Sequence, residues 1–83
     1  MISQHAKVID LHGLDSNYAS ILVKDFILDH YKLRNKYLSI IHGRGQGILR
    51  KRIHEDLKRN KLVKEYKLNM FNDGETLVVL DLK

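Results

Sequence analysis

The sequence predicts an α/β fold of the α+β type, a two-layer sandwich in which a four-stranded mixed sheet carries two helices on one face. Short β-rich runs and amphipathic segments follow one another in the order β-α-β-α-β-β. With 83 residues and neither proline nor cysteine, the chain has the size of one domain and lacks disulfides and thiolate metal sites. Right-handed crossovers place both helices on the same face, and the last strand enters between the second and third. The predicted strand order is therefore 1-2-4-3.

The first strand and the first helix are predicted within residues 7–34. Residues 7–11 form a short β-rich run that ends at His12-Gly13, and Asp15 or Ser16 offers a side-chain oxygen to cap the helix that follows. Apolar residues recur at steps of three and four up to about Arg34, which predicts a wide buried face. These residues are Tyr18, Ile21, Leu22, Val23, Phe26, Ile27 and Leu33. Residues 1–6 are expected to form a flexible arm before a single domain over residues 7–83, in a complete protein.

The second half is predicted to hold a strand, a helix and a hairpin. Residues 37–41 form the second strand, and a helix over residues 48–60 turns Leu49, Ile53 and Leu57 toward the core. Residues 63–70 alternate in polarity, which is typical of an edge strand. Residues 77–80 are all apolar, which indicates a central strand. Residues 72–74, Asn-Asp-Gly, are expected to form the hairpin turn because they tolerate positive φ.

The positive charge is concentrated in one segment. The whole chain carries +5, with a pI near 9.6, and residues 44–64 alone hold eight basic and two acidic residues. Such a segment predicts a surface for a polyanion, RNA or DNA, although a solvated basic helix would have the same composition. No apolar run approaches the length of a membrane span, and residues 1–7 lack the apolar core of a signal peptide. We therefore expect a cytoplasmic monomer that does not bind membranes.

Candidate site residues follow the first two strands. Asp10 and His12 lie two apart at the end of the first strand, so Asp10 can orient His12 and raise its basicity. The carboxyl ends of neighbouring parallel strands lie together, which brings His42 to the same edge. A glycine-rich loop then opens into the second helix, where backbone N–H groups can bind phosphate. Three basic residues near the start of that helix lie at the positive end of its dipole, a conflict that a bound anion would relieve. The predicted nucleic-acid-binding residues are Gly43, Arg44, Gly45, Gln46, Gly47, Arg50, Lys51 and Arg52.

These two segments resemble the marker motifs of the small MutS-related (Smr) domain, Leu-Asp-x-His and His/Thr-Gly-x-Gly. They are residues 8–13, Val-Ile-Asp-Leu-His-Gly, and residues 40–50, Ile-Ile-His-Gly-Arg-Gly-Gln-Gly-Ile-Leu-Arg. The resemblance spans residues 8–82 and implies a fold like the C-terminal domain of bacterial translation initiation factor three. It also implies nucleic-acid binding, with RNA cleavage or DNA nicking in some members. Many members in the second MutS class have Arg where this chain has His12, so His12 favours the active branch. The Glu-Ala pair frequent early in the family's first helix is Tyr18-Ala19 here.

The residue types limit the chemistry of such an endonuclease. A two-metal mechanism needs several carboxylates at the scissile phosphate, and this site offers only Asp10. RNA supplies its own 2′-hydroxyl nucleophile, so His12 as general base and His42 as general acid would suffice, with Arg44 and loop N–H groups around the phosphorane. No cofactor is then required. A single divalent metal held by Asp10, His12 and His42 is the alternative.

A binding module without catalysis is the competing interpretation. The same loop and basic helix could bind structured RNA, DNA or a ribosomal surface, with His12 contacting only phosphate or base. A third interpretation is a protein-interaction domain with an incidental basic face, which would lack the steep salt dependence of polyanion binding. The other histidines have simpler predicted roles: His5 lies in the arm, and His30 and His54 lie at helix surfaces or boundaries.

Overall fold

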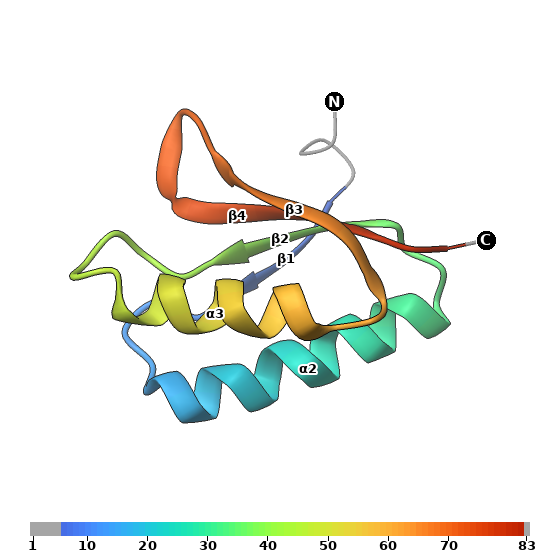
Figure 1. Ribbon diagram of the computed structural model, residues 1–83, viewed down its shortest axis with the longest axis horizontal. Helices are drawn as coiled ribbons and strands as arrows, with labels where there is room; N and C mark the ends of the chain where they lie inside the picture. Colours follow the sequence, from blue (N-terminus) through green and yellow to red (C-terminus); the bar gives the residue numbers. More distant parts are fainter. Residues whose placement is uncertain (1–5, 83) are drawn as a thin grey trace.

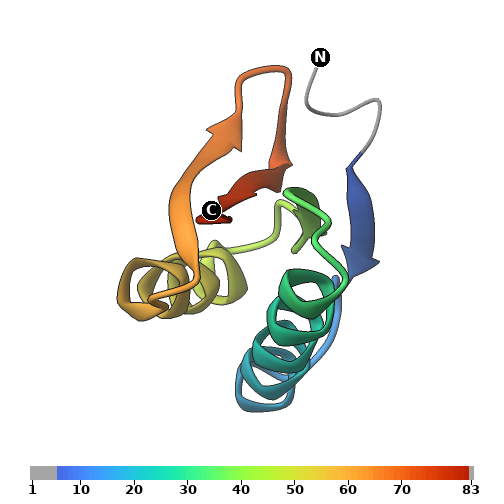
Figure 2. The same ribbon diagram turned by 90° about the vertical axis from the view of Figure 1, so that its right-hand side faces the viewer.

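The computed structural model describes residues 6–82, which form two layers: a twisted sheet and two helices packed against one of its faces (Figures 1 and 2). The elements are β1 (Lys7–Asp10), α2 (Ser16–Lys32), β2 (Tyr37–Ile41), α3 (Ile48–Arg59), β3 (Val63–Asn69) and β4 (Asn72–Leu80). The strand order is β1-β2-β4-β3, which confirms the predicted fold class and topology. The predicted arm lies outside the described residues except for Ala6.

β4 occupies the centre of the sheet, as the run of apolar residues 77–80 predicts. It pairs antiparallel with β2 on one side and with β3 on the other, while β1 pairs parallel with β2 at the opposite edge. Val78 and Leu80 are fully buried, and Val79 on the other face is 7% exposed. Because a central strand is covered by both neighbours, it can carry an unbroken apolar run. β3 is an edge strand, and its polarity alternates accordingly.

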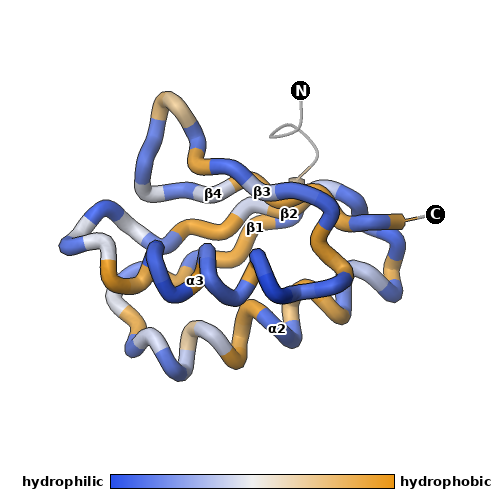
Figure 3. The backbone as a smooth tube through the Cα atoms, in the orientation of Figure 1, coloured by the Kyte–Doolittle hydropathy of each residue, from blue (hydrophilic) through white to orange (hydrophobic). Residues whose placement is uncertain are grey.

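The core lies between the sheet and the inner sides of the helices. It contains Leu11, Ala19, Val23, Ile27, Leu38, Ile40, Ile53, Leu57, Val78 and Leu80. The Asp15 carboxylate accepts hydrogen bonds from the backbone N–H groups of Asn17 and Tyr18, at 3.0 and 3.2 Å, and thereby caps α2. Only Ile53 and Leu57 of α3 are buried, and the helix is mostly hydrophilic in Figure 3.

The buried face of α2 is narrower than the sequence predicts. Tyr18, Ile21 and Leu33 are 54%, 61% and 68% exposed, whereas Ala19 and Ser20 are buried. A helix in a two-layer sandwich is covered on one side only, and the side of α2 toward α3 carries Ser20, whose hydroxyl bonds to Asp56. The apolar periodicity therefore identified the helix correctly but assigned too many of its side chains to the core.

The hairpin turn lies two residues earlier than predicted. Met70 and Phe71 form the turn, and residues 72–74 already belong to β4. The Asn69 side chain accepts a hydrogen bond from the N–H of Phe71 at 2.9 Å, so the asparagine before the turn stabilises it. Gly74 is required for a different reason, because a Cβ there would lie 3.2 Å from the backbone carbon of Gly43 and 3.3 Å from its Cα. Close approach of two backbones, and not positive φ, selects this glycine.

Gly74→Ala is expected to destabilise the domain by about 1–3 kcal/mol, since the added methyl group must push the Gly43 backbone aside. For a domain of this size, the melting temperature then falls by about 4–8 °C per kcal/mol. Gly45→Ala is the matched control, because a Cβ at Gly45 meets no atom within 4 Å. Thermal unfolding followed by circular dichroism measures both variants. Equal melting temperatures for the two would contradict the close packing of β4 against residue 43.

Candidate functional site

The segments that follow β1 and β2 lie side by side. Asp10 pairs with Ile41 in the parallel register, and the N–H of Leu11 donates to the carbonyl of Ile41 at 2.6 Å. One step further, a Cβ on Gly43 would lie only 3.1 Å from the Cβ of His12. The two motifs singled out in the sequence therefore meet at one edge of the sheet, where the topology of parallel strands predicts them.

Asp10 and His12 form an exposed hydrogen-bonded pair. The ring Nδ1 of His12 lies 2.6 Å from Oδ1 of Asp10, and the backbone N–H of His12 donates to the same oxygen at 3.1 Å. The side chains are 52% and 69% exposed. The hydrogen bond to His12 lowers the pKa of Asp10, and the same bond raises the pKa of His12 above 6.5. With Nδ1 bound to the carboxylate, Nε2 is the ring nitrogen left to meet a ligand.

His42, which the parallel strands were predicted to bring to the same edge as this pair, is buried, with 4% of its surface exposed. Its Nδ1 is 3.0 Å from the carbonyl oxygen of Gly43, and its Nε2 is 2.8 Å from the hydroxyl of Thr76. Both ring nitrogens are therefore engaged inside the protein. The predicted role of general acid does not fit this arrangement, because a proton donor must reach the leaving group. His42 instead holds the start of the glycine-rich loop.

The Thr76 hydroxyl joins His42 to His54. Nε2 of His54 lies 2.6 Å from the same oxygen, and the two imidazole rings meet edge-on with centroids 5.9 Å apart. All three bonds are satisfied if His54 donates to Thr76, Thr76 donates to Nε2 of His42, and His42 donates to Gly43. Burial, followed by the influence of His42 and Arg50, lowers the pKa of His54 and so favours its neutral ring, which can make this donation through its Nε2–H group. Sequence reasoning missed this network because Thr76 is 34 residues from His42.

The start of the loop over residues 43–47 is fixed to β4. The N–H groups of His42 and Gly43 both donate to the carbonyl of Gly74, at 2.9 and 3.0 Å, and Arg44 forms a 2.9 Å ion pair with Asp73. Gly47 adopts φ +81° as the N-cap of α3 and offers no side chain to accept from the first N–H groups of the helix. These donors remain for an anion. In Figure 1 the loop lies below the β3–β4 hairpin.

A hollow of about 270 Å³ lies at this loop. Its lining includes Gly13 and Leu14 from the segment after β1, His42, the glycine-rich loop, and the first residues of α3. The exposed pair formed by Asp10 and His12 directly precedes Gly13 in the chain. His12 does not itself line the hollow, but it precedes Gly13 and lies against residue 43, and both of these residues do. The backbone N–H groups of the recess can surround a phosphate group.

The basic cluster after the loop divides between two directions. Arg50 folds back over Gly47, with its Nη2 3.1 Å from the position of a Cβ there, and Lys51 is exposed beside it. Arg52 instead faces α2, where it donates to the Asn17 side chain at 2.7 Å. Within α3 it also lies 3.7 Å from Asp56, four residues further along the helix. The prediction of one three-residue surface is therefore wrong in this respect, because Arg52 joins the two helices.

The three residues of the alternative metal site do not converge. Both ring nitrogens of His42 are engaged with Gly43 and Thr76, and Asp10 is bound to His12. Within residues 6–82, no group of three or more metal-ligating side chains is arranged to hold an ion.

The described chain also has no helix with the length and apolar character needed to cross a bilayer.

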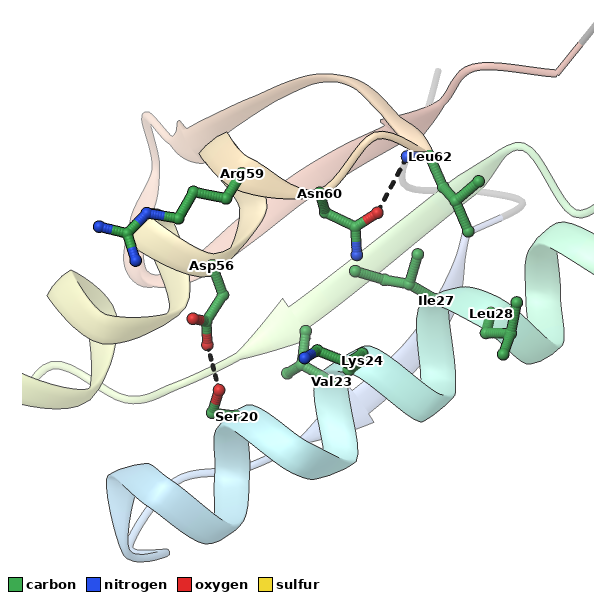
Figure 4. Close-up of a pocket in the computed structure, with 9 residues that line it drawn as sticks. All are labelled: Ser20, Val23, Lys24, Ile27, Leu28, Asp56, Arg59, Asn60 and Leu62. Atoms are coloured by element: carbon green, nitrogen blue, oxygen red, sulfur yellow. Dashed lines mark hydrogen bonds between the residues drawn. The ribbon is translucent and has the colours of Figure 1, made fainter.

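A separate hollow of about 440 Å³ lies between α2 and α3 (Figure 4). The hydroxyl of Ser20 donates to Asp56 across the helices, and the side chain of Asn60 accepts from the N–H of Leu62. None of the predicted site residues lines it. The bond between Ser20 and Asp56 joins the two helices, and the sheet edge remains the candidate site.

Comparison with known proteins identifies the family of the domain. The Smr domain family model matches residues 9–81. The chain is 41% identical over 76 residues to an endonuclease MutS2 of Clostridium tetani and 43% identical over 75 residues to one of Clostridium botulinum strain Eklund 17B. These matches cover 90% and 87% of this chain but only 10% of each relative. The chain thus spans about a tenth of the length of these curated relatives.

Two solved structures share the fold. The crystal structure of the Smr domain of Thermus thermophilus MutS2 superposes with a TM-score of 0.87 at 32% identity, covering 90% of this chain and 98% of that chain. YdaL, a stand-alone small MutS-related protein from Escherichia coli, gives a TM-score of 0.84 at 21% identity, covering 92% of this chain and 64% of that one. The resemblance predicted from the two motifs is confirmed, and the chain belongs to the Smr domain family.

Proposed function

We propose that this domain binds nucleic acid and cleaves RNA phosphodiesters at the edge of the sheet where β1 and β2 end. The observation that carries the proposal is the 2.6 Å hydrogen bond between Asp10 and His12, which orients an exposed imidazole in the segment directly before Gly13, a residue that lines the recess of the glycine-rich loop. The name of the relatives, endonuclease MutS2, supports cleavage of a nucleic acid. The choice of RNA rests on chemistry, since the site holds an oriented base but no cluster of metal ligands in residues 6–82.

In the proposed reaction, Nε2 of His12 accepts the proton of the 2′-hydroxyl group. The 2′-oxygen attacks phosphorus, the bond from phosphorus to the 5′-oxygen breaks, and a 2′,3′-cyclic phosphate and a 5′-hydroxyl group result. Asp10 holds the ring through Nδ1 and stabilises the imidazolium that forms. Because His12 is 69% exposed, solvent water can deliver the proton to the leaving oxygen, and His42 is not needed as an acid.

The loop supplies electrostatic stabilisation in this scheme. The N–H groups at the start of α3 have no side-chain acceptor, and they can donate to the non-bridging oxygens as charge grows on the phosphorane. Arg44 lies in the same loop and is 70% exposed, so its guanidinium can approach the substrate while it keeps its ion pair with Asp73. His42 acts as a positioning residue, because it bonds to the Gly43 carbonyl and fixes the loop.

The test uses labelled RNA and DNA, single- and double-stranded, incubated with the domain and with His12→Ala. Cleavage of RNA by the wild-type chain and its loss in the variant support the proposal. Cleavage of DNA at an equal rate would contradict the 2′-hydroxyl mechanism. Separation of the products by size and identification of their ends gives the readout.

Arg50→Gln combined with Lys51→Gln is expected to weaken binding of RNA and DNA alike, because these cations border the loop and contact phosphates without reading sequence. The slope of log affinity against log salt should become shallower by about one to two units, roughly one for each phosphate that is no longer neutralised. Fluorescence anisotropy at several salt concentrations measures it. Lys24→Gln with Lys32→Gln, on α2, is the charge-matched control. An equal weakening in the control pair would show a nonspecific effect of net charge.

A binding module without catalysis is a second candidate, and the burial of His42 favours it. With both ring nitrogens of His42 engaged, the site offers one exposed imidazole and no second acid or base of the predicted pair. In that case His12 contacts phosphate, and its raised pKa strengthens the contact by favouring the imidazolium. Binding that persists without cleavage of any of the four substrates would support this candidate.

A further inference from the structure

Besides the recess of about 270 Å³, which is the first hollow at the glycine-rich loop, the loop borders a second hollow, of about 490 Å³, between α3 and β3. Its lining comes from the end of the loop, the outer face of α3 and one residue of β3. These residues are Gln46, Gly47, Arg50, Lys51, His54, Glu55, Lys58 and Tyr66. None of them belongs to the pair of Asp10 and His12, so this hollow is a separate feature of the surface.

The two hollows share part of their lining. Gln46 and Gly47 border both of them. A strand bound with one phosphate at the recess beside His12 therefore needs to pass only over these two residues to reach the second hollow. The guanidinium of Arg50 lies over Gly47, with its Nη2 3.1 Å from the position of a Cβ there, so a strand that crosses the loop meets this cation.

The lining of the second hollow has the composition of a nucleotide site. Arg50, Lys51 and Lys58 supply three cations against the one carboxylate of Glu55, and Lys51 and Lys58 are exposed. Tyr66 supplies an aromatic ring at the opposite wall. A groove that combines cations for the backbone with an aromatic side chain for the bases is the usual design for single-stranded nucleic acid.

The Tyr66 ring is held by its neighbours, because it is partly buried and packs against the core. The Tyr66 ring meets the His54 ring edge-on, with centroids 5.2 Å apart and an angle of 66° between the planes. His54 is in turn bonded to Thr76, which also bonds to His42 at the first hollow. A ring fixed in this way loses little conformational entropy when a base stacks on it.

We propose that this hollow is a second nucleotide subsite, in which Tyr66 stacks a base of the strand next to the scissile phosphate while Lys58 and Arg50 contact its backbone. The subsite rests on the proposed function and extends it, because it identifies the substrate as a single strand that continues across the loop. It binds a flanking nucleotide and takes no part in the bond cleavage.

The test compares a short and a long single-stranded oligouridylate, of about three and about nine nucleotides, in fluorescence anisotropy. The wild-type chain should bind the longer oligomer more tightly, and Tyr66→Leu should weaken binding of the longer oligomer about tenfold, the range for removal of one stacked base. Tyr66→Phe should retain the affinity, since the phenyl ring still stacks. Lys58→Gln should weaken the longer oligomer and reduce its salt dependence.

Lys67→Gln is the matched control, because Lys67 is an exposed lysine of β3 that does not line the second hollow. A melting curve establishes that Tyr66→Leu is folded, and Lys58→Gln alters an exposed side chain and provides the test if it is not. Equal losses of affinity for the short and long oligomers, or no effect from Lys58→Gln, would overturn the subsite. Cleavage lost in His12→Ala with full binding of the long oligomer by Tyr66→Leu would leave the proposed function standing without this extension.

Discussion

His12→Ala is expected to lower the single-turnover rate of RNA cleavage about a hundredfold or more, the usual effect of removing a general base. The dissociation constant should change little, because the loop and the cations around it provide most of the phosphate contacts. Asp10→Asn should give a smaller defect, since the imidazole remains but loses its carboxylate partner. The double variant should be no slower than His12→Ala if the two residues act as a unit. An equally large loss of binding in His12→Ala would instead assign His12 to affinity.

The pH profile tests the same pair independently. The hydrogen bond from Asp10 raises the pKa of His12, so the rate should begin to fall at a pH above 6.5 as the imidazole becomes protonated and can no longer accept a proton. In Asp10→Asn the pKa of His12 should return toward its ordinary value. The acid limb of the profile, the pH range in which the rate falls on acidification, should then shift to lower pH. Rates measured between about pH 5 and 9 show the shift. An acid limb at the same pH in both chains would contradict the coupling.

A single 2′-deoxy substitution at the scissile nucleotide should abolish cleavage, because it removes the nucleophile and leaves the rest of the substrate intact. Binding of the substituted strand should remain near that of RNA, which separates the chemical step from recognition. The same substitution one nucleotide away is the control and should be cut normally. RNA products should end in a 2′,3′-cyclic phosphate or a 3′-phosphate.

Chelation by EDTA should leave this cleavage unchanged, since the proposed chemistry uses a side chain as base. Loss of activity in EDTA with recovery in Mg²⁺ or Mn²⁺ would overturn the mechanism. It would also require His42 to leave the hydrogen bonds that it makes with Gly43 and Thr76 if it is to act as a ligand. Continued cleavage of the 2′-deoxy strand would show that activated water is the nucleophile.

The sequence predicted the fold well because the decisive signals are local. Four consecutive apolar residues distinguish a central strand from an edge strand, and helical periodicity located α2 and α3 within two residues at their ends. The hairpin turn was misplaced because Asn-Asp-Gly is a strong local turn signal. Here Gly74 is selected by the backbone of Gly43, 31 residues earlier in the chain, and no local pattern reveals such a contact.

The position of the candidate site was predictable from topology, but the orientation of its side chains was not. Parallel strands bring His12 and His42 to one edge, and the sequence indicates no more than this proximity. Burial of His42 depends on Thr76 and His54, which come from other elements. The direction of Arg52 depends likewise on Asn17 in α2. Two histidines that look equivalent in the sequence therefore differ in exposure, and only His12 reaches solvent.

The central position of β4 determines the order in which the site can assemble during folding. Until β4 joins the sheet, the side of β2 that faces away from β1 has no paired strand. The start of the loop then lacks its hydrogen bonds to the carbonyl of Gly74, and His42 lacks its bond to the hydroxyl of Thr76. A nascent chain that has not yet reached residue 80 can form both helices but leaves the edge of β2 open to other strands. Pairing of β2 with β4 is non-local and slow to form compared with the helices. The recess at the loop therefore cannot become organised before β4 has joined the sheet.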